Sequence, residues 1–153
     1  AYNKKIPFIF DPGQGLPMFN EKELKDFIEK ATYITVNDYE AELLSKNSHM
    51  SLDEIQKKVD ALIITKGSSG STIMTSSDKI HIPAFNVENP VDPTGCGDAY
   101  RAGIAYGIVN NWDWDKSGKL ASALASLKVN YKGGQNHNPS IDEIQSLAGF
   151  NIN

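Results

Sequence analysis

The sequence predicts an α/β fold, in which helices flank a largely parallel β-sheet. Short runs of apolar and β-branched residues alternate along the chain with stretches whose apolar residues recur at helical spacing. One run, residues 61–65, is apolar almost throughout, as in strands that a parallel sheet buries on both faces. A chain of 153 residues, 40% hydrophobic and 22% charged, is long enough for one domain with a substantial core.

Composition also limits the partners of the chain. Its net charge of −4 offers no electrostatic basis for binding nucleic acid or an anionic membrane surface. No apolar stretch approaches the length that spans a bilayer. The single cysteine, Cys96, excludes an internal disulfide and fits a reducing compartment. We therefore expect a cytoplasmic protein.

Local patterns place the individual elements. Strands are predicted at residues 6–10, 32–36, 61–65, 71–75 and 79–83, with a loop over residues 13–19. Asn20, Asn37, Ser51 and Ser140 are predicted to cap helices, because acidic residues and then apolar residues at helical spacing follow them. Two further helices are predicted, one from the first turn around residue 98 through residue 109, the other from residue 115 or 117 through residue 129.

The main functional signal is residues 91–103, a short extended run, a glycine turn and the start of a helix. Gly95 and Gly97 allow positive φ and a close approach of the backbone to a ligand. A helix start leaves about four amides without intrahelical partners, and these bind anions such as phosphate. Asp98 adds a carboxylate that can take a proton from a hydroxyl. This combination suits phosphoryl transfer to an alcohol.

This stretch also fits other interpretations. Gly-x-Gly before a helix can be only a tight turn, with Asp98 as a capping acid. A dinucleotide motif would need glycine in place of Tyr100, and a P-loop would need Gly-Lys-Ser/Thr after Gly97, so both are excluded. Cys96 could be a nucleophile with a lowered pKa, which would require a histidine partner among His49, His81 and His137.

Two other strand ends carry polar residues. Asn37 and Glu40 fit a helix capping box, or alternatively a pair in which the glutamate orients the water shell of magnesium. Residues 66–70 fit a hairpin loop, or alternatively a backbone wall against a nucleotide, with Lys66 near phosphate. Together with Asp92, these strand ends are expected to meet at one edge of the sheet, where open α/β sheets bind ligands.

These motifs resemble those of a known family. Residues 92–98, Asp-Pro-Thr-Gly-Cys-Gly-Asp, resemble the second signature of the PfkB/ribokinase family of sugar and nucleoside kinases. Residues 37–40 are similar to its Asn-x-x-Glu motif, and residues 65–70 to its Thr-x-Gly-x-x-Gly nucleotide loop. The form of the first motif is most similar to bacterial adenosine kinase-like members. The resemblance implies a partial ribokinase-like three-layer sandwich and the use of ATP, Mg²⁺ and a monovalent cation such as K⁺.

The resemblance also implies roles for individual residues. Asp98 would be the catalytic base, and the anion hole would be formed by the amides of Gly95, Cys96 and Gly97. Metal placement would fall to Glu40, assisted by Asn37, and to Asp92, with Asp92 and Thr94 beside the monovalent cation. The nucleotide would contact Lys66, Gly67 and Gly70, and its adenine would be flanked by Ala125, Val129, Gly133 and His137.

Members of this family are about twice as long as this chain. We therefore expect residues 1–153 to be the C-terminal, nucleotide-binding part of such a kinase, without the acceptor-binding half and its lid, and inactive alone. The expected acceptor is a nucleoside such as adenosine, with a sugar as the main alternative. A non-catalytic nucleotide-binding module is a further alternative. An exposed sheet edge would favour association into a homo-oligomer.

Overall fold

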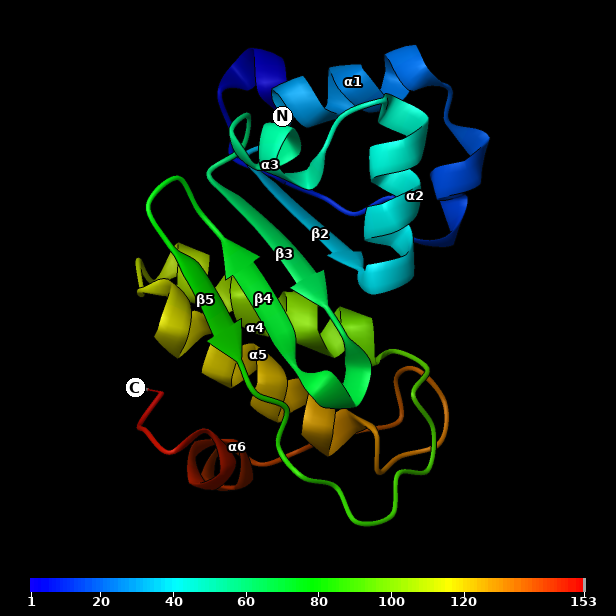
Figure 1. The fold of residues 1–153 in the computed structure, drawn as a ribbon. Coiled ribbons are helices and arrows are strands. Elements are labelled where there is room, and N and C mark those ends of the chain that lie inside the picture. Colours follow the sequence, from blue (N-terminus) through cyan, green and yellow to red (C-terminus); the bar gives the residue numbers. More distant parts are fainter. Residues whose placement is uncertain (153) are drawn as a thin grey trace. The chain divides into compact units, whose positions relative to one another are not determined.

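The computed structural model describes residues 1–152 and divides into two compact units. The first unit comprises Ala1–Lys66 and Thr72–Ile80. The second comprises Gly67–Ser71 and the chain from His81 onward. Figure 1 labels the helices and strands along the chain.

A five-stranded sheet belongs almost entirely to the first unit. Its strands follow one another in sequence order: β1 (Ile9–Phe10), β2 (Tyr33–Asn37), β3 (Ala61–Thr65), β4 (Ser71–Met74) and β5 (Lys79–Ile82). The β1–β2 and β2–β3 pairs are parallel, with Val36 opposite Ile64 in the second pair. The arrow of β4 points the opposite way from that of β3 (Figure 1), because so short a connection can join only antiparallel strands. The predicted α/β fold with a largely parallel sheet and flanking helices is therefore confirmed.

The helices of the first unit are α1 (Glu21–Lys30), α2 (Asp38–Ser48) and α3 (Leu52–Gln56), with 3₁₀ turns at Tyr2–Lys4 and Gly13–Met18. Each α-helix begins after the cap residue that the sequence predicts, and each cap forms a capping box. The side chains of Asn20, Asn37 and Ser51 accept a hydrogen bond from the amide three residues on, and the glutamate at that position accepts one from the backbone amide of the cap residue. Local sequence alone therefore determines where these helices begin.

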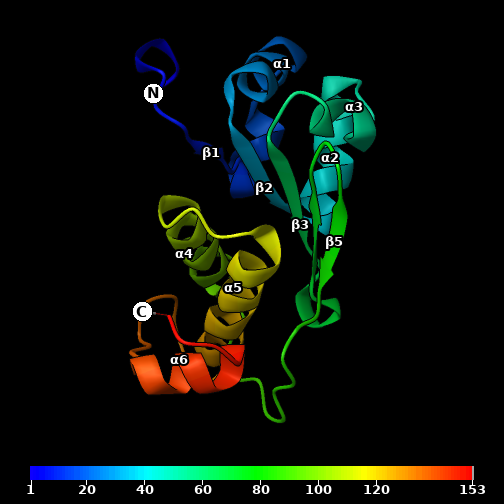
Figure 2. The same cartoon turned by 90° about the vertical axis from the view of Figure 1, so that its left-hand side faces the viewer.

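The core of the first unit lies between these helices and the sheet. Leu24 and Ile28 of α1 are fully buried with Ile34 of β2 and Leu62 of β3. The rings of Phe10 and Phe27 stack with centroids 4.6 Å apart. Figure 2 shows α1, α2 and α3 on one side of β2 and β3.

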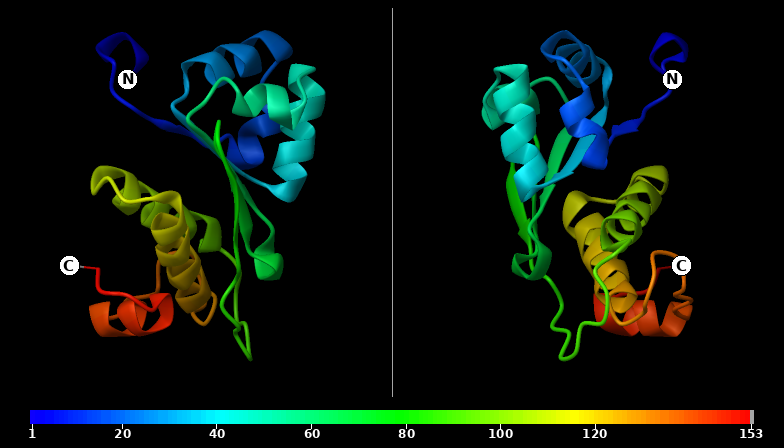
Figure 3. Two further views of the ribbon diagram at one scale, coloured as in Figure 1. Left: turned by 60° about the vertical axis from the view of Figure 1, so that its left-hand side comes forward. Right: turned by 90° about the vertical axis from the view of Figure 1, so that its right-hand side faces the viewer.

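The second unit is built on α4 (Cys96–Val109), α5 (Trp114–Lys128) and α6 (Ile141–Ala148). Helices α4 and α5 lie side by side in Figures 2 and 3, and α6 packs against α5. Glycines allow this close approach. A Cβ added at Gly103 would overlap the backbone of Ala121, and one at Gly107 would overlap the side chain of Ser117. Small residues of α4 and α5 thus form the surface on which the two helices pack.

Several boundaries differ from the prediction. Residues Gly13–Met18 form a 3₁₀ helix rather than a loop, and the first strand is limited to Ile9–Phe10. Helix α5 begins at Trp114, earlier than predicted, because the Asp113 side chain accepts from the Lys116 amide at 2.7 Å and caps the helix. Residues 91 and 92 join no strand. Their amides donate instead to the carbonyl of Val129, at 2.9 and 3.0 Å.

Across residues 1–152, no helix has both the length and the apolar character needed to cross a membrane.

Candidate functional site

The loop before α4 is held by the carboxylate of Asp92. Its Oδ1 accepts from the Thr94 amide at 2.9 Å and its Oδ2 from the Gly133 amide at 2.7 Å. These hydrogen bonds, from Gly133 first and then Thr94, lower the pKa of Asp92 to about 2. The carboxylate therefore joins the residue 92–97 loop to the residue 130–134 loop that follows α5.

Gly95 is required where these two loops meet. Its φ is +83°, a conformation that residues with a Cβ rarely adopt. A Cβ there would also lie 2.6 Å from the carbonyl oxygen of Gly134. The glycine therefore permits both the turn into α4 and the close contact of the two loops.

The start of α4 presents free backbone donors. Among residues 1–152, the amides of Gly95, Gly97 and Asp98 donate to no protein acceptor. The Cys96 amide differs from the prediction, because it donates to the Pro93 carbonyl at 3.0 Å and is not a free donor. Gly97 also differs, since it lies inside the helix and its φ is not positive. A Cβ at Gly97 would meet nothing within 4 Å, so there is open space beside this residue in the first turn of α4.

Asp98 lies in the first turn of α4, as predicted, and its side chain is 71% exposed. Its carboxylate forms an ion pair with Arg101 one turn later on the same helix. Partial burial lowers the pKa of Arg101. The position of Asp98 in the first turn agrees with the prediction, and its role as a base stays a prediction.

The glycine-serine turn of residues 66–70 is a 3₁₀ turn, Gly67–Ser69, in the predicted β3–β4 hairpin. Gly70 has φ +82°, and a Cβ there would overlap the backbone of residues 82–84. Ser71 then fixes the turn to α4, since its Oγ lies 2.6 Å from the buried hydroxyl of Tyr100. Burial raises the pKa of Tyr100 to about 12. Lys66 is exposed at the end of β3.

Asn37 and Glu40 lie in the first unit and form the capping box of α2. Asn37 Oδ1 accepts from the Glu40 amide at 2.7 Å, and Glu40 Oε2 accepts from the Asn37 amide at 2.9 Å. The capping interpretation is therefore confirmed. The magnesium role of the pair stays a prediction.

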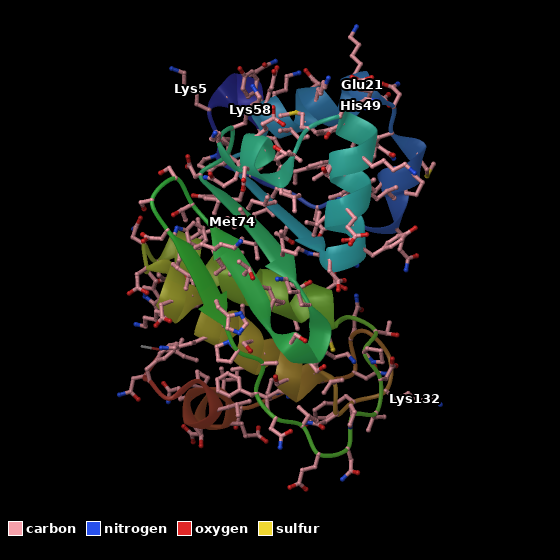
Figure 4. All side chains as sticks on the ribbon, in the orientation of Figure 1. Lys5, Glu21, His49, Lys58, Met74 and Lys132 are labelled. Atoms are coloured by element: carbon pink, nitrogen blue, oxygen red, sulfur yellow. The ribbon has the colours of Figure 1, made fainter. Side chains whose placement is uncertain are left out.

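The residues predicted to flank adenine lie at the end of α5 and in the loop after it. Ala125 and Val129 are half-buried, and Val129 supplies the carbonyl that accepts from residues 91 and 92. Gly133 donates to Asp92, and His137 is half-buried with an Nδ1 that makes no hydrogen bond within residues 1–152. The exposed Lys132 is labelled in this loop in Figure 4. The adenine role of these residues stays a prediction.

The alternative of a cysteine nucleophile is wrong in its premise. Burial raises the pKa of the Cys96 thiol, whereas a nucleophilic cysteine needs a lowered one. Of the candidate histidine partners, His49 belongs to the first unit, where its Nε2 lies 3.8 Å from Glu21 (Figure 4). His81 is exposed on β5.

Within residues 1–152, no three His, Cys, Asp or Glu residues gather in a way that could hold a metal ion. Both oxygens of Asp92 already accept amide hydrogen bonds, so its metal role stays a prediction. Glu40 retains one carboxylate oxygen outside its capping bond. Magnesium needs few protein carboxylates when phosphates and waters complete its shell, so a single glutamate is compatible with it.

Sequence reasoning missed two residues of this site. Tyr100 stands where a dinucleotide motif would need glycine, and Lys128 lies outside every motif of the sequence. Lys128 is fully buried and donates to the carbonyls of Asp92 and Tyr131, at 2.9 and 3.0 Å. The one signal in the sequence was a lysine within the apolar helical pattern of α5.

These features define an α/β protein in which free amides and an acidic residue meet at one helix start. The sequence profile of the pfkB family of carbohydrate kinases matches residues 2–141, and the chain belongs to this family. The family consists of kinases, which use ATP, generally together with Mg²⁺. The predicted family and its ribokinase-like fold are thereby confirmed.

Individual relatives include nucleoside and sugar kinases. The chain is 41% identical over 135 residues to a nucleoside kinase of Methanocaldococcus jannaschii, and 32% identical over 147 residues to ribokinase of Bacillus subtilis. These matches cover 88% and 96% of this chain but 45% and 48% of those proteins.

Among solved structures, the Burkholderia thailandensis nucleoside kinase in complex with inosine is similar, with a TM-score of 0.95 and 46% identity. The match covers 98% of this chain and 50% of that one. The chain thus spans about half the length of the relatives that it matches.

Proposed function

We propose that residues 1–153 are the C-terminal, nucleotide-binding part of an ATP-dependent kinase that phosphorylates a hydroxyl of a nucleoside. The observation that carries this proposal is the start of α4, where the amides of Gly95, Gly97 and Asp98 have no acceptor within residues 1–152 and Asp98 adds a carboxylate in the first turn. Membership of the pfkB family supports the reaction class.

The free amides form the anion hole. They would bind oxygens of the transferring phosphoryl group, where negative charge is spread over several oxygens. The positive end of the α4 dipole points in the same direction and strengthens this interaction. Cys96 contributes no free amide, because its own amide donates to the Pro93 carbonyl.

Asp98 would act as the general base. Its exposed carboxylate can accept the proton of the acceptor hydroxyl as the oxygen attacks phosphorus. Arg101 would keep that carboxylate in place before the acceptor binds. After proton transfer, the guanidinium remains next to the site and offsets part of the charge of the phosphates.

ATP would lie along the second unit. Its phosphates would face the start of α4, the turn containing Gly67 and Gly70 would contact the nucleotide, and the adenine would lie near the end of α5 and His137. Magnesium, when bound, would neutralise charge on the phosphates. By the family resemblance, Glu40 and Asn37 would place it, with Lys66 near the phosphates.

A purine nucleoside is the acceptor that we favour. The relative in complex with inosine is 46% identical, whereas the ribokinase is 32% identical. Adenosine is the first nucleoside to test, on the basis of the form of residues 92–98. A sugar acceptor is the second candidate, supported by the ribokinase match over 96% of the chain.

The test has two parts. Titration calorimetry of this polypeptide with ATP and Mg²⁺ should give binding that inorganic pyrophosphate weakens by competition. A turnover assay with adenosine, inosine or ribose should give little or no product. Binding without turnover would support the half-enzyme, full turnover would refute the claim that an acceptor-binding half is needed, and absence of nucleotide binding would refute the proposal itself.

A further inference from the structure

A charged side chain without a role in the proposed chemistry lies buried beside the candidate site. Lys128, the last residue of α5, has no exposed surface, and it is the largest fully buried side chain described. Its ammonium donates to the carbonyl oxygens of Asp92 and Tyr131, at 2.9 and 3.0 Å. The acceptors come from the two loops that carry the site.

Burying a lysine ammonium is costly. Removing such a charge from water costs several kcal/mol unless close partners compensate for the lost hydration. Here the compensation comes from two carbonyl oxygens and from the charge of the Asp92 carboxylate, whose pKa the lysine helps to lower. Carbonyl oxygens and a nearby carboxylate are also the groups that replace the water shell of an alkali cation in proteins.

Oxygen atoms from both loops make a positive charge favourable at the position of the Lys128 ammonium. The two loops bring oxygen atoms together: the carbonyls of residues 92 and 131 point at one place, and Asp92 adds a negative charge. Without a positive charge between them, these oxygens would repel one another. The loops are otherwise joined by the Gly133 amide and by the close contact of Gly95 with Gly134.

We propose that the Lys128 ammonium is a built-in cation, which holds the residue 92–97 loop against the residue 130–134 loop and takes the place of a free monovalent ion. The family resemblance implied a monovalent cation beside Asp92 and Thr94, and the lysine makes that ion unnecessary. Lys128 is thus a positioning residue for the start of α4. This inference does not depend on the bound nucleotide or on the acceptor.

The first test uses the unaltered chain. Its melting temperature, followed by circular dichroism, should be the same in KCl, NaCl, LiCl and tetramethylammonium chloride at equal ionic strength. A stabilisation specific to K⁺ would overturn the proposal, because it would reveal a separate ion site. This measurement requires no variant, so it decides the matter even if substitution of Lys128 prevents folding.

The second test uses Lys128→Ala, which leaves a space the size of the missing side chain. The melting temperature should fall by about 5 °C or more in tetramethylammonium chloride, and K⁺ or ammonium should restore at least half of the loss. The control is Lys119→Ala, which removes an exposed lysine of the same helix paired with Asp115 and should show no cation-specific rescue.

A third variant, Lys128→Met, keeps the bulk and removes the charge. If it were as stable as the unaltered chain, the charge would have no role and the proposal would fail. An equal fall in the melting temperature of Lys128→Ala in every salt would also contradict the proposal, because it would indicate that Lys128 acts through packing alone.

Discussion

The carboxylate Oδ2 of Asp92 accepts a 2.7 Å hydrogen bond from the amide of Gly133, a residue 41 positions further along the chain. This bond joins the turn that opens α4 to the loop that closes α5. The geometry of the free amides at the start of α4 therefore depends on an ionised carboxylate outside the helix.

Protonation of Asp92 should weaken this arrangement in acid. The pKa of Asp92 is lowered to about 2 in the folded chain from an ordinary value of 3.8, so the folded state favours the ionised form. The stabilisation is fully present above pH 3.8 and is lost as the pH falls toward 2. Asp92→Asn should accordingly lower the melting temperature at pH 7, and the difference from the unaltered chain should shrink between pH 4 and pH 2.

Glu88→Gln is the matched control for this experiment, because Glu88 is an exposed acid of the same unit for which no hydrogen bond is found within residues 1–152. The melting temperature of Glu88→Gln should differ little from that of the unaltered chain at every pH. If the melting temperatures of Asp92→Asn and the unaltered chain differed by the same amount from pH 7 to pH 2, the role assigned to the carboxylate would be contradicted.

The two glycines of the motif should respond in opposite ways to alanine. Gly95→Ala requires a Cβ at positive φ and 2.6 Å from the Gly134 carbonyl, so it should lower the free energy of unfolding by about 2 kcal/mol or more. Gly97→Ala adds a methyl group to open space within a helix and should leave stability unchanged or raise it slightly. Urea denaturation measures both effects.

Gly97→Ala should affect nucleotide binding, although it should not reduce stability. A methyl group added at Gly97 would occupy open space in the first turn of α4, at the proposed anion site, so Gly97→Ala should weaken ATP binding while the fold stays intact. Calorimetry would show this as a higher Kd. An unchanged Kd would mean that phosphate does not approach the start of α4.

The buried pair of Ser71 and Tyr100 is expected to couple the glycine-serine turn to α4. Tyr100→Phe leaves the Ser71 hydroxyl buried without its partner, at a cost of about 1–3 kcal/mol. Adding Ser71→Ala should recover part of this loss, so the two substitutions should not be additive in a double-mutant cycle. Additive losses would argue against direct coupling.

Alkaline pH tests the same tyrosine. Burial raises its pKa to about 12, above the ordinary value of 10, so the folded chain holds the protonated form. Stability from this group is present below pH 10 and is lost as the pH rises toward 12. Tyr100→Phe should remove the last-titrating tyrosine from an absorbance titration. If the last step of the titration were still present in Tyr100→Phe, it would belong to another tyrosine.

Asp98→Asn tests the proposed base. In the intact kinase of which we propose this chain is a part, turnover should fall ~10²-fold or more, because the amide cannot take the proton of the acceptor. ATP binding should be unchanged, since the backbone donors remain. Asp142→Asn, which alters an exposed first-turn acid of α6, is the control and should keep full activity. Unchanged turnover in Asp98→Asn would remove this residue from the mechanism.

Much of the fold could be predicted because its signals are local. The capping boxes at Asn20, Asn37 and Ser51 involve residues three positions apart, and the apolar run of β3 needs no partner to be recognised. The glycine-rich motif and Asp98 were found in the same way. The predicted start of α5 lies too late in the chain, because the prediction did not include Asp113 as the cap of this helix.

The sequence by itself determined the α/β class, the family and the helix start on which the proposed chemistry depends, because each is expressed within a few neighbouring residues. Only the tertiary structure decided which amides stay free, that Asp92 holds Gly133, and that Lys128 is buried between two loops. The bond of Lys128 to Asp92 and the bond of Gly133 to Asp92 join residues 36 and 41 positions apart, which folding brings together and which no short pattern records.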